Sequence, residues 1–209
     1  MTVQYDLKEQ ERVYATFAKF YDAIYLWLFA LPHRRIAAAA SAGGPKILEI
    51  GAGTGLVLRY YKRDREVIAA DLSVAMLRKA QEKIGRLGLS HVRGIVAMDA
   101  CNLGFPDTAF DVVSIPFMIT LVPDPEKALD EAFRVLKPGG LIVIISRFGA
   151  EDGFQAQVEA AVAPLMKRIG LSSSFKVSRV ASWAERRGDI AMRDVSRGLY
   201  FKMLTLQKH

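Results

Sequence analysis

The chain has 209 residues, of which 51% are hydrophobic and 24% are charged, and this indicates one globular domain with a sizeable core. Its single cysteine, Cys101, excludes an intrachain disulfide framework and indicates a reducing compartment, and the three scattered histidines argue against a metal cluster. The net charge of +7 predicts an anionic partner, either nucleic acid or an acidic membrane surface, and does not choose between them.

The first forty residues have the pattern of amphipathic helices. Apolar and aromatic side chains recur at helical spacing from Val13 to Leu28, and no charge occurs from Ala23 to Pro32. That uncharged run is too short to cross a bilayer of about 30 Å. Its basic flanks are typical of a helix in a membrane interface, although a core helix has a similar pattern. We predict a helical membrane-interface segment over residues 1–40 that caps the ligand site, and a second domain over residues 41–209.

A buried strand enters a glycine-rich turn near residue 50. The apolar run 46–50 leads into three alternating glycines, and a helix is expected over residues 56–62. Such turns bind nucleotide-like cofactors in doubly wound α/β sheets. The spacing differs from the dinucleotide fingerprint G-x-G-x-x-G. The carboxylate of Glu49 would also repel a pyrophosphate, whereas it suits a ligand with an ammonium group. The three glycines are Gly51, Gly53 and Gly55.

Further buried strands follow in chain order. Residues 66–70 form a strand that ends at Asp71, about 20 residues after Gly51, where this fold class places an acid for ribose hydroxyls. Ser73 can cap the next helix, in which Met76 is a candidate cover for an adenine ring, with ordinary packing as the alternative. More strands are predicted over residues 92–98, 110–115, 141–146, 189–195 and 200–206, and a helix over residues 124–136.

The glycine turn, Asp71, Asp99 and the turn 137–140 together resemble the class I S-adenosylmethionine-dependent methyltransferases. The resemblance implies an α/β fold: a doubly wound, seven-stranded Rossmann-like sheet with helices on both faces and an antiparallel last strand. It also implies S-adenosyl-L-methionine as cofactor. Asp99 would meet the adenine amino group, although a lone Asp at a strand end is often a turn former. The residues expected at the cofactor are Tyr21, Glu49, Gly51, Gly53, Asp71, Leu72, Met76, Asp99, Ala100 and Ile115.

The whole chain resembles the Rhodobacter-type phospholipid N-methyltransferases, which act on phosphatidylethanolamine. This implies methyl transfer to the head-group amine, toward phosphatidylcholine, by a cytoplasmic enzyme held peripherally on the inner face of the cell membrane. Its partners would be the phospholipid and an anionic membrane surface, without nucleic acid or metal. Tyr21 is expected at the reacting end, and Arg147 could hold the lipid phosphate. The resemblance rests on Tyr14, residues 18–22, the glycine turn, residues 148–151, 163–165 and 171–175, and Val177.

Several features keep other readings open. Relatives often have Asn-His where Ser146 and Arg147 stand here, which leaves the role of position 147 undecided. A soluble quinone or small-molecule methyltransferase would share every cofactor motif but needs no apolar, basic N-terminus. A nucleic-acid methyltransferase would explain the charge. However, residues 114–117 lack the Pro-Pro-Tyr type of motif that enzymes methylating base amino groups carry.

Overall fold

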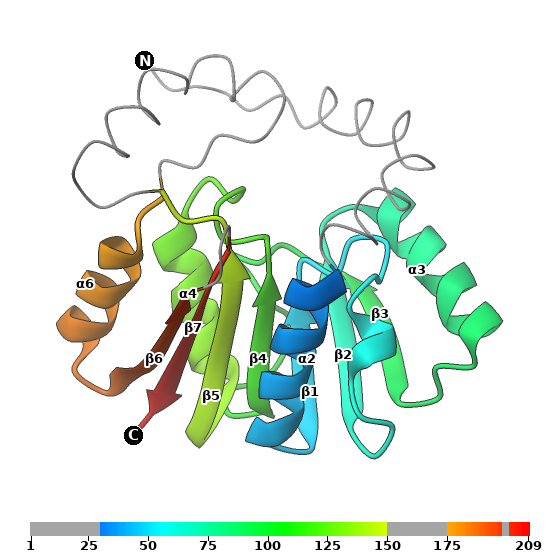
Figure 1. Ribbon diagram of the computed structural model, residues 1–209, viewed down its shortest axis with the longest axis horizontal. Coiled ribbons are helices and arrows are strands. Elements are labelled where there is room, and N and C mark those ends of the chain that lie inside the picture. The colour runs from blue at the N-terminus through cyan, green and yellow to red at the C-terminus, as the bar shows by residue number, and fades with distance from the viewer. Residues whose placement is uncertain (1–29, 150–174, 198–200) are drawn as a thin grey trace.

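The computed structural model describes residues 30–149, 175–197 and 201–209, and this part of the chain forms a seven-stranded sheet. The strand order is β3-β2-β1-β4-β5-β7-β6 (Figure 1). The first five strands are parallel, and β7 runs antiparallel between β5 and β6, which confirms the predicted doubly wound sheet. The strands are β1 (Lys46–Ile50), β2 (Glu66–Asp71), β3 (Val92–Ala97), β4 (Phe110–Pro116), β5 (Leu136–Ser146), β6 (Ile190–Arg197) and β7 (Lys202–Lys208).

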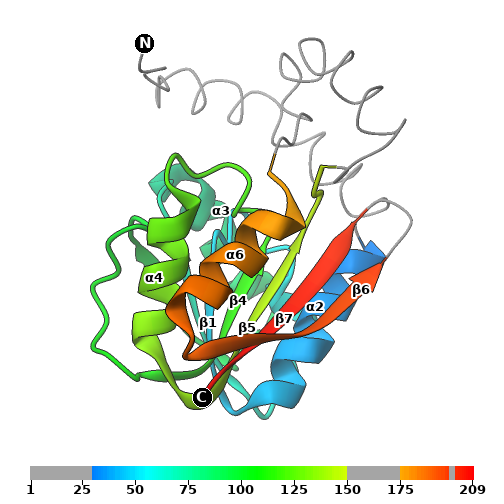
Figure 2. The ribbon, with the colours of Figure 1, turned by 90° about the vertical axis from the view of Figure 1, so that its left-hand side faces the viewer.

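Helices cover both faces of the sheet (Figure 2). On one face, α2 (Ala30–Gly43) and the 3₁₀ helix η1 (Leu58–Tyr60) share a buried cluster with β1, β2 and β4, and α3 (Val74–Leu87) packs against it through Ile84. On the other face, α4 (Pro125–Val135) and α6 (Val177–Arg187) share the larger cluster. The parallel strands are therefore buried between two helical layers, as their continuous apolar runs require.

Local capping fixes where α3 and α4 begin. The Ser73 hydroxyl accepts from Met76 N at 3.3 Å, and the Asp124 carboxylate accepts from Lys127 N at 3.0 Å. The helix α3 ends at Gly88, whose φ of +57° lies in the left-handed region that favours glycine. The predicted helices over these segments are confirmed to within one or two residues.

The helix predicted over residues 56–62 is wrong, because only the three-residue η1 forms there. The backbone becomes extended at Tyr61, whose buried hydroxyl lies against the sheet 2.6 Å from Glu49 Oε2. Because this hydrogen bond holds Tyr61 against the sheet, no second helical turn forms after η1. The turn 137–140 also differs, since β5 already begins at Leu136. Leu136 pairs with Phe110 and the next pair is Leu141 with Val112, so residues 137–140 bulge out of the ladder.

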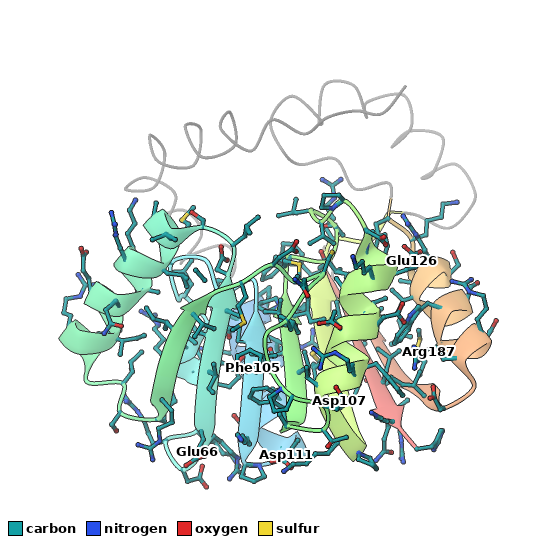
Figure 3. All side chains as sticks on the ribbon, turned by 180° about the vertical axis from the view of Figure 1, so that it is seen from behind. Glu66, Phe105, Asp107, Asp111, Glu126 and Arg187 are labelled. Atoms are coloured by element: carbon teal, nitrogen blue, oxygen red, sulfur yellow. The ribbon has the colours of Figure 1, made fainter. Side chains whose placement is uncertain are left out.

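Polar and cation–π contacts hold α6 against α4. The Arg187 guanidinium lies 3.8 Å from the centre of the Phe133 ring and donates to Asp130 Oδ1 at 2.8 Å. Trp183 Nε1 donates to the same oxygen at 3.0 Å. Glu126 on α4 and Arg187 on α6 both lie on the face of the molecule seen in Figure 3. These contacts fix α6, so that the chain can return through β6 and β7 to the edge of the sheet.

The helix α2 crosses the predicted boundary between residues 40 and 41. Its buried side chains Ile36, Ala37 and Ala40 belong to the core cluster under the sheet. The predicted stripe from Val13 to Leu28 lies outside the described residues, and so does the predicted Tyr21 site residue. In the parts of the chain that the structure describes, no helix is both long enough and apolar enough to span a bilayer.

Arg134 fastens the loop between β3 and β4 to the end of α4. Its guanidinium donates to the carbonyl oxygens of Leu103 and Phe105, each at 2.8 Å, and to Asp107 Oδ1 at 2.7 Å. Figure 3 labels Phe105 and Asp107 on this loop. The guanidinium also pairs with Glu131 within α4. One side chain thus supplies the partners of two loop carbonyls that no strand pairs.

We expect Arg134→Gln to lower the free energy of unfolding by about 1.5–3 kcal/mol, because hydrogen bonds from a charged group to loop carbonyls are lost. Urea denaturation measures this change. The matched control is Arg93→Gln, whose 3.8 Å pair with Glu66 is exposed and should contribute about 0.5 kcal/mol or less. Equal effects of the two substitutions would contradict the role of Arg134 as an anchor.

Candidate functional site

The carboxyl ends of β1 and β4 mark the place where the strand order reverses. From β1 the chain leads outward to β2 and β3, whereas β4 returns beside β1 and leads the other way (Figure 1). Ligands of doubly wound sheets bind at such a switch point. The loops after these strands meet closely here, since a Cβ built on Gly51 would lie 2.4 Å from Met118 Cβ. With its φ of +78° as well, position 51 requires glycine.

Backbone hydrogen bonds fix the glycine loop across the ends of two strands. Gly51 N and Ala52 N both donate to the carbonyl oxygen of Ala70, at 2.8 and 3.1 Å. Gly53 N donates to Asp71 Oδ2 at 2.7 Å. A Cβ built on Gly53 meets no atom of the described residues within 4 Å, so among these residues this glycine borders open space. The loop therefore presents bare backbone to a volume that a ligand can fill.

Asp71 joins this loop to the start of α3. Its second oxygen, Oδ1, accepts from Ser73 N at 2.8 Å, and Ser73 caps the helix. The half-buried carboxylate retains lone pairs, since each of its oxygens has two. The side chain of Leu72 beside it is 58% exposed, and Met76 is partly exposed one turn into α3. Asp71, Leu72 and Met76 thus lie on one continuous turn next to the glycine loop.

Three other predicted residues are placed differently. The Asp99 carboxylate accepts from Cys101 N at 2.8 Å, which is the turn-forming arrangement foreseen as the alternative for this residue. Asp99 is exposed, whereas Ala100 is buried against the core. Ile115 has no exposed surface within β4, so a ligand near it would meet other atoms first. These residues still lie at the carboxyl ends of β3 and β4.

Glu49 is fully buried at the end of β1. Its Oε2 lies 2.6 Å from the Tyr61 hydroxyl, which in turn lies 2.9 Å from Ser114 Oγ. Its Oε1 is buried and has no hydrogen-bond partner among the described residues. Burial raises the pKa of Glu49 to about 8; the hydrogen bond from Tyr61 opposes this shift and the charge of Asp71 adds to it. Burial and the neighbouring Glu49 also raise the pKa of Tyr61, so this hydroxyl keeps its proton.

Basic side chains from two helices approach the same region. Lys83 of α3 is buried, and its Nζ lies 3.4 Å from Thr54 Oγ1 in the glycine loop. His33 of α2 is buried with its ring 5.5 Å from that of Phe117, which follows β4. Burial, together with the charges of Arg59 and Lys83, lowers the pKa of His33 to about 4. This imidazole is therefore neutral at physiological pH.

The structure brings most of the predicted cofactor residues together. The ends of β1 and β2 hold Glu49, Gly51, Gly53, Asp71 and Leu72 side by side, and Arg147 follows β5 at the same edge of the sheet. A buried oxygen without a partner and open space at a glycine fit a ligand that carries an ammonium group and ribose hydroxyls. In the described parts of the chain, no three His, Cys, Asp or Glu side chains are placed to hold a metal ion.

Sequence reasoning missed the side chains that surround Glu49. Tyr61 and Ser114 become its neighbours only when η1 folds back and β4 pairs with β1, and neither event leaves a local pattern. Lys83 did leave a signal. It falls at helical spacing from the buried Leu77 and Ala80 on the apolar side of α3, where a charge is unexpected.

The comparisons match residues 48–144, here called the cofactor half, to a general methyltransferase family, and almost the whole chain to a more specific relative. A family described as a methyltransferase domain matches residues 48–144. The phosphatidylethanolamine N-methyltransferase of Cereibacter sphaeroides is 36% identical over 97% of this chain and 99% of its own length. The ubiquinone/menaquinone biosynthesis C-methyltransferase UbiE of Pasteurella multocida is 41% identical over 49% of this chain, but only 40% of that protein is covered.

A solved structure has the same fold. A SAM dependent methyltransferase from Aquifex aeolicus superimposes with a TM-score of 0.63 and 20% sequence identity, covering 83% of this chain and 89% of its own. Because the identity is so low, this likeness concerns the fold alone.

The raised pKa of Glu49 predicts an unusual dependence of stability on pH. Between its ordinary pKa of 4.5 and the folded value of about 8, the folded chain keeps a proton that the unfolded chain releases. The contribution of Glu49 to stability must therefore fall as the pH rises through this range, by up to about 1.4 kcal/mol per pH unit. Glu49→Gln removes this slope. We therefore expect the free energy of unfolding of the variant, relative to that of the wild type, to increase from pH 5 to pH 8.

Urea denaturation at several pH values measures the difference. The control is Glu131→Gln. The hydrogen bond from Arg134 lowers the pKa of Glu131, so the ionised form contributes stability that appears as the pH rises toward 4.5. That variant should lose stability relative to the wild type over the acidic range. Parallel curves for Glu49→Gln and the wild type from pH 5 to 8 would show that Glu49 is ionised in the fold.

Proposed function

The chain belongs to the S-adenosylmethionine-dependent methyltransferases, and we propose that it methylates the amine of phosphatidylethanolamine at a membrane surface. One observation supports this choice of substrate. The relative named phosphatidylethanolamine N-methyltransferase matches almost the whole chain, at 36% identity over 203 residues. The quinone methyltransferase relatives match only 106 residues. A match that includes the residues outside the cofactor half is the one that bears on the acceptor.

The cofactor residues have distinct roles in this proposal. When bound, S-adenosylmethionine supplies a methyl group on a sulfonium sulfur, which an amine can displace in line. Glu49 holds the ammonium group of its methionine part, and Asp71 accepts from the ribose hydroxyls. Gly53 admits the ligand to the backbone and Gly51 sets the loop against Met118, while Leu72 and Met76 cover the adenine ring beside Asp99, Ala100 and the end of β4 at Ile115. The two carboxylates lie on adjacent strands, joined through the glycine loop by the Gly53–Asp71 hydrogen bond.

The acceptor needs a dry site that aligns its nitrogen with the methyl group. An ethanolamine amine is mostly protonated at neutral pH, as lysine is, and the ammonium form has no lone pair for attack. Burial favours the neutral amine, and alignment then contributes most of the remaining acceleration. We assign Tyr21 to this reacting end, where its ring face would stabilise the cation that forms. Arg147, at the carboxyl end of β5, would hold the lipid phosphate.

Exposed apolar side chains at the carboxyl edge of the sheet support the proposed membrane binding. Four large apolar side chains in its loops and helix ends are exposed: Leu31 by 67%, Leu72 by 58%, Val74 by 49% and Leu121 by 50%. Two basic side chains, Arg34 near the start of α2 and Arg59 in η1, lie over the Tyr60 ring. Apolar residues among cations are typical of proteins that bind anionic membrane interfaces. This supports peripheral binding at the inner face of the cell membrane, with the reaction in the cytoplasm.

A quinone substrate is the second candidate, because the relative from Pasteurella multocida is 41% identical over 106 residues. A lipid assay separates the two. We expect labelled methyl groups from S-adenosylmethionine to enter phosphatidylethanolamine in vesicles and not a demethylated quinone. Tyr21→Ala should lower the rate by one to three powers of ten, since a cation–π contact and a hydrogen bond are each worth about 2 kcal/mol. Tyr21→Phe separates the ring from the hydroxyl.

The controls fix what each result means. Binding of S-adenosylhomocysteine should change less than the rate in both Tyr21 variants. Full activity of Tyr21→Ala would remove this residue from the site. A folded, cofactor-binding wild type that methylates the quinone and no lipid would overturn the phospholipid assignment.

The exposed leucines give a test of membrane binding. We expect the double variant Leu31→Ser, Leu121→Ser to bind vesicles containing anionic lipid about tenfold more weakly or worse, because two apolar side chains no longer enter the interface. Added salt should also weaken binding of the wild type by screening its cations. The matched control is Leu87→Ser. This leucine is 39% exposed at the end of α3, at the opposite edge of the sheet. Equal loss in both variants would place the membrane contact elsewhere.

A further inference from the structure

Two side chains from separate segments lie beside the buried carboxyl group of a third, Glu49. Glu49 comes from β1, Ser114 from the neighbouring β4 and Tyr61 from the segment after η1, and each is at most 2% exposed. The Tyr61 hydroxyl lies between the other two, 2.6 Å from Glu49 Oε2 and 2.9 Å from Ser114 Oγ. A phenol has one proton to donate. If it donates that proton to the carboxyl group, the Ser114 hydroxyl donates to the Tyr61 oxygen.

This arrangement leaves the carboxyl group half satisfied. Oε2 is held by Tyr61, whereas Oε1 is buried without a partner among the described residues. An ionised carboxylate with one unpaired, buried oxygen is costly, so the empty site favours the protonated acid. An ammonium group brings three donors and a positive charge, and either would satisfy Oε1.

Other charged groups on the surrounding elements do not supply that partner. Asp71 of β2 is an anion and disfavours ionisation of Glu49 further. His33 of α2 is neutral, because burial lowers its pKa to about 4. Lys83 of α3 reaches Thr54, and the charges of Lys83 and of Arg59 in η1 act on His33. Within residues 30–149, 175–197 and 201–209, Oε1 therefore has no hydrogen-bond partner, and a bound ligand can supply one.

We propose that Tyr61 is a positioning residue for the cofactor: together with Ser114 it holds the Glu49 carboxyl group as the acceptor for the α-ammonium group, and cofactor binding expels the proton of Glu49. The balance is simple. A neutral carboxylic acid and an ammonium ligand become a carboxylate–ammonium pair, and one proton passes to water. The proposal rests on the assignment of Glu49 to the cofactor and is independent of which acceptor is methylated.

The proton release sets how affinity depends on pH. In the empty protein the pKa of Glu49 is about 8, and the bound ammonium lowers it. Below pH 8 the proton must leave on binding, so affinity rises with pH by up to about tenfold per unit. Above pH 8 the group is already ionised and affinity levels off. Tyr61→Phe removes the hydrogen bond that favours ionisation of Glu49. The pH at which affinity stops rising, called the break, should therefore be higher in this variant.

Calorimetric titration with S-adenosylhomocysteine from pH 6 to pH 9, in two buffers of different ionisation enthalpy, measures affinity and released protons together. For the wild type we expect close to one proton released at pH 7. Glu49→Gln should release none from this site and lose the break near pH 8. For Tyr61→Phe we expect about tenfold weaker binding or worse at pH 7, with the break displaced upward, and Ser114→Ala should shift it less. The ligand's own titration is common to all four proteins and cancels in their comparison.

Two further measurements keep the outcome clear. 5′-Methylthioadenosine lacks the ammonium group and should bind without proton release. Thermal unfolding checks that each variant is folded. Tight wild-type binding with flat affinity and no released proton would overturn the proposal. So would a Tyr61→Phe curve that is weaker by the same factor at every pH, since that describes a merely structural role. No lipid is present, so a failure here is distinct from failure of the phospholipid assignment.

Discussion

A carboxyl group without a full set of partners, buried in the middle of the sheet, is the constraint around which the first half of the chain is arranged. The position of Glu49 in β1 gives it no exposed surface, and its neighbours satisfy only one of its oxygens. A protein selected for stability alone would have an apolar residue there. Instead, the backbone leaves the helical conformation at Tyr61, soon after the glycine loop, and the Tyr61 side chain points inward to Glu49. A destabilised, pre-organised group at the switch point of a doubly wound sheet is what a ligand-binding site requires.

The same region shows how closely the ligand loops depend on one another. Gly51 leaves no room for a side chain beside Met118, so the loops after β1 and β4 set each other's position. Asp71 accepts from both Gly53 and Ser73, and thereby ties the glycine loop to the first turn of α3. A ligand that engages Asp71 therefore acts on a unit made of one loop and one helix, and not on a single side chain.

Much of this architecture could be predicted from the sequence because its causes are local. Buried parallel strands need continuous apolar runs, and Ser73, Asp124 and Gly88 mark helix ends through their own side chains or backbone freedom. The misplaced features have tertiary causes. The sequence after Gly55 predicts a helix, but the contact of Tyr61 with Glu49 replaces most of it. The bulge at residues 137–140 follows only from the pairing of Leu136 with Phe110. Glu49 could be predicted as a ligand residue, whereas Tyr61 and Ser114 are neighbours only in space.

The acceptor must be chosen by residues outside the shared cofactor half. A relative named for quinone methylation is 41% identical over 106 residues of this chain, so likeness to a methyltransferase does not by itself distinguish an amine from a carbon nucleophile. Within the described chain, Arg147 follows β5 at the carboxyl edge, the edge where Leu31, Leu72, Val74 and Leu121 are exposed. If that edge faces the bilayer, a lipid head group can reach the switch point while its tails stay in the membrane. Transferring the tails to water would forfeit about 0.8 kcal/mol per CH₂, and this geometry avoids that cost.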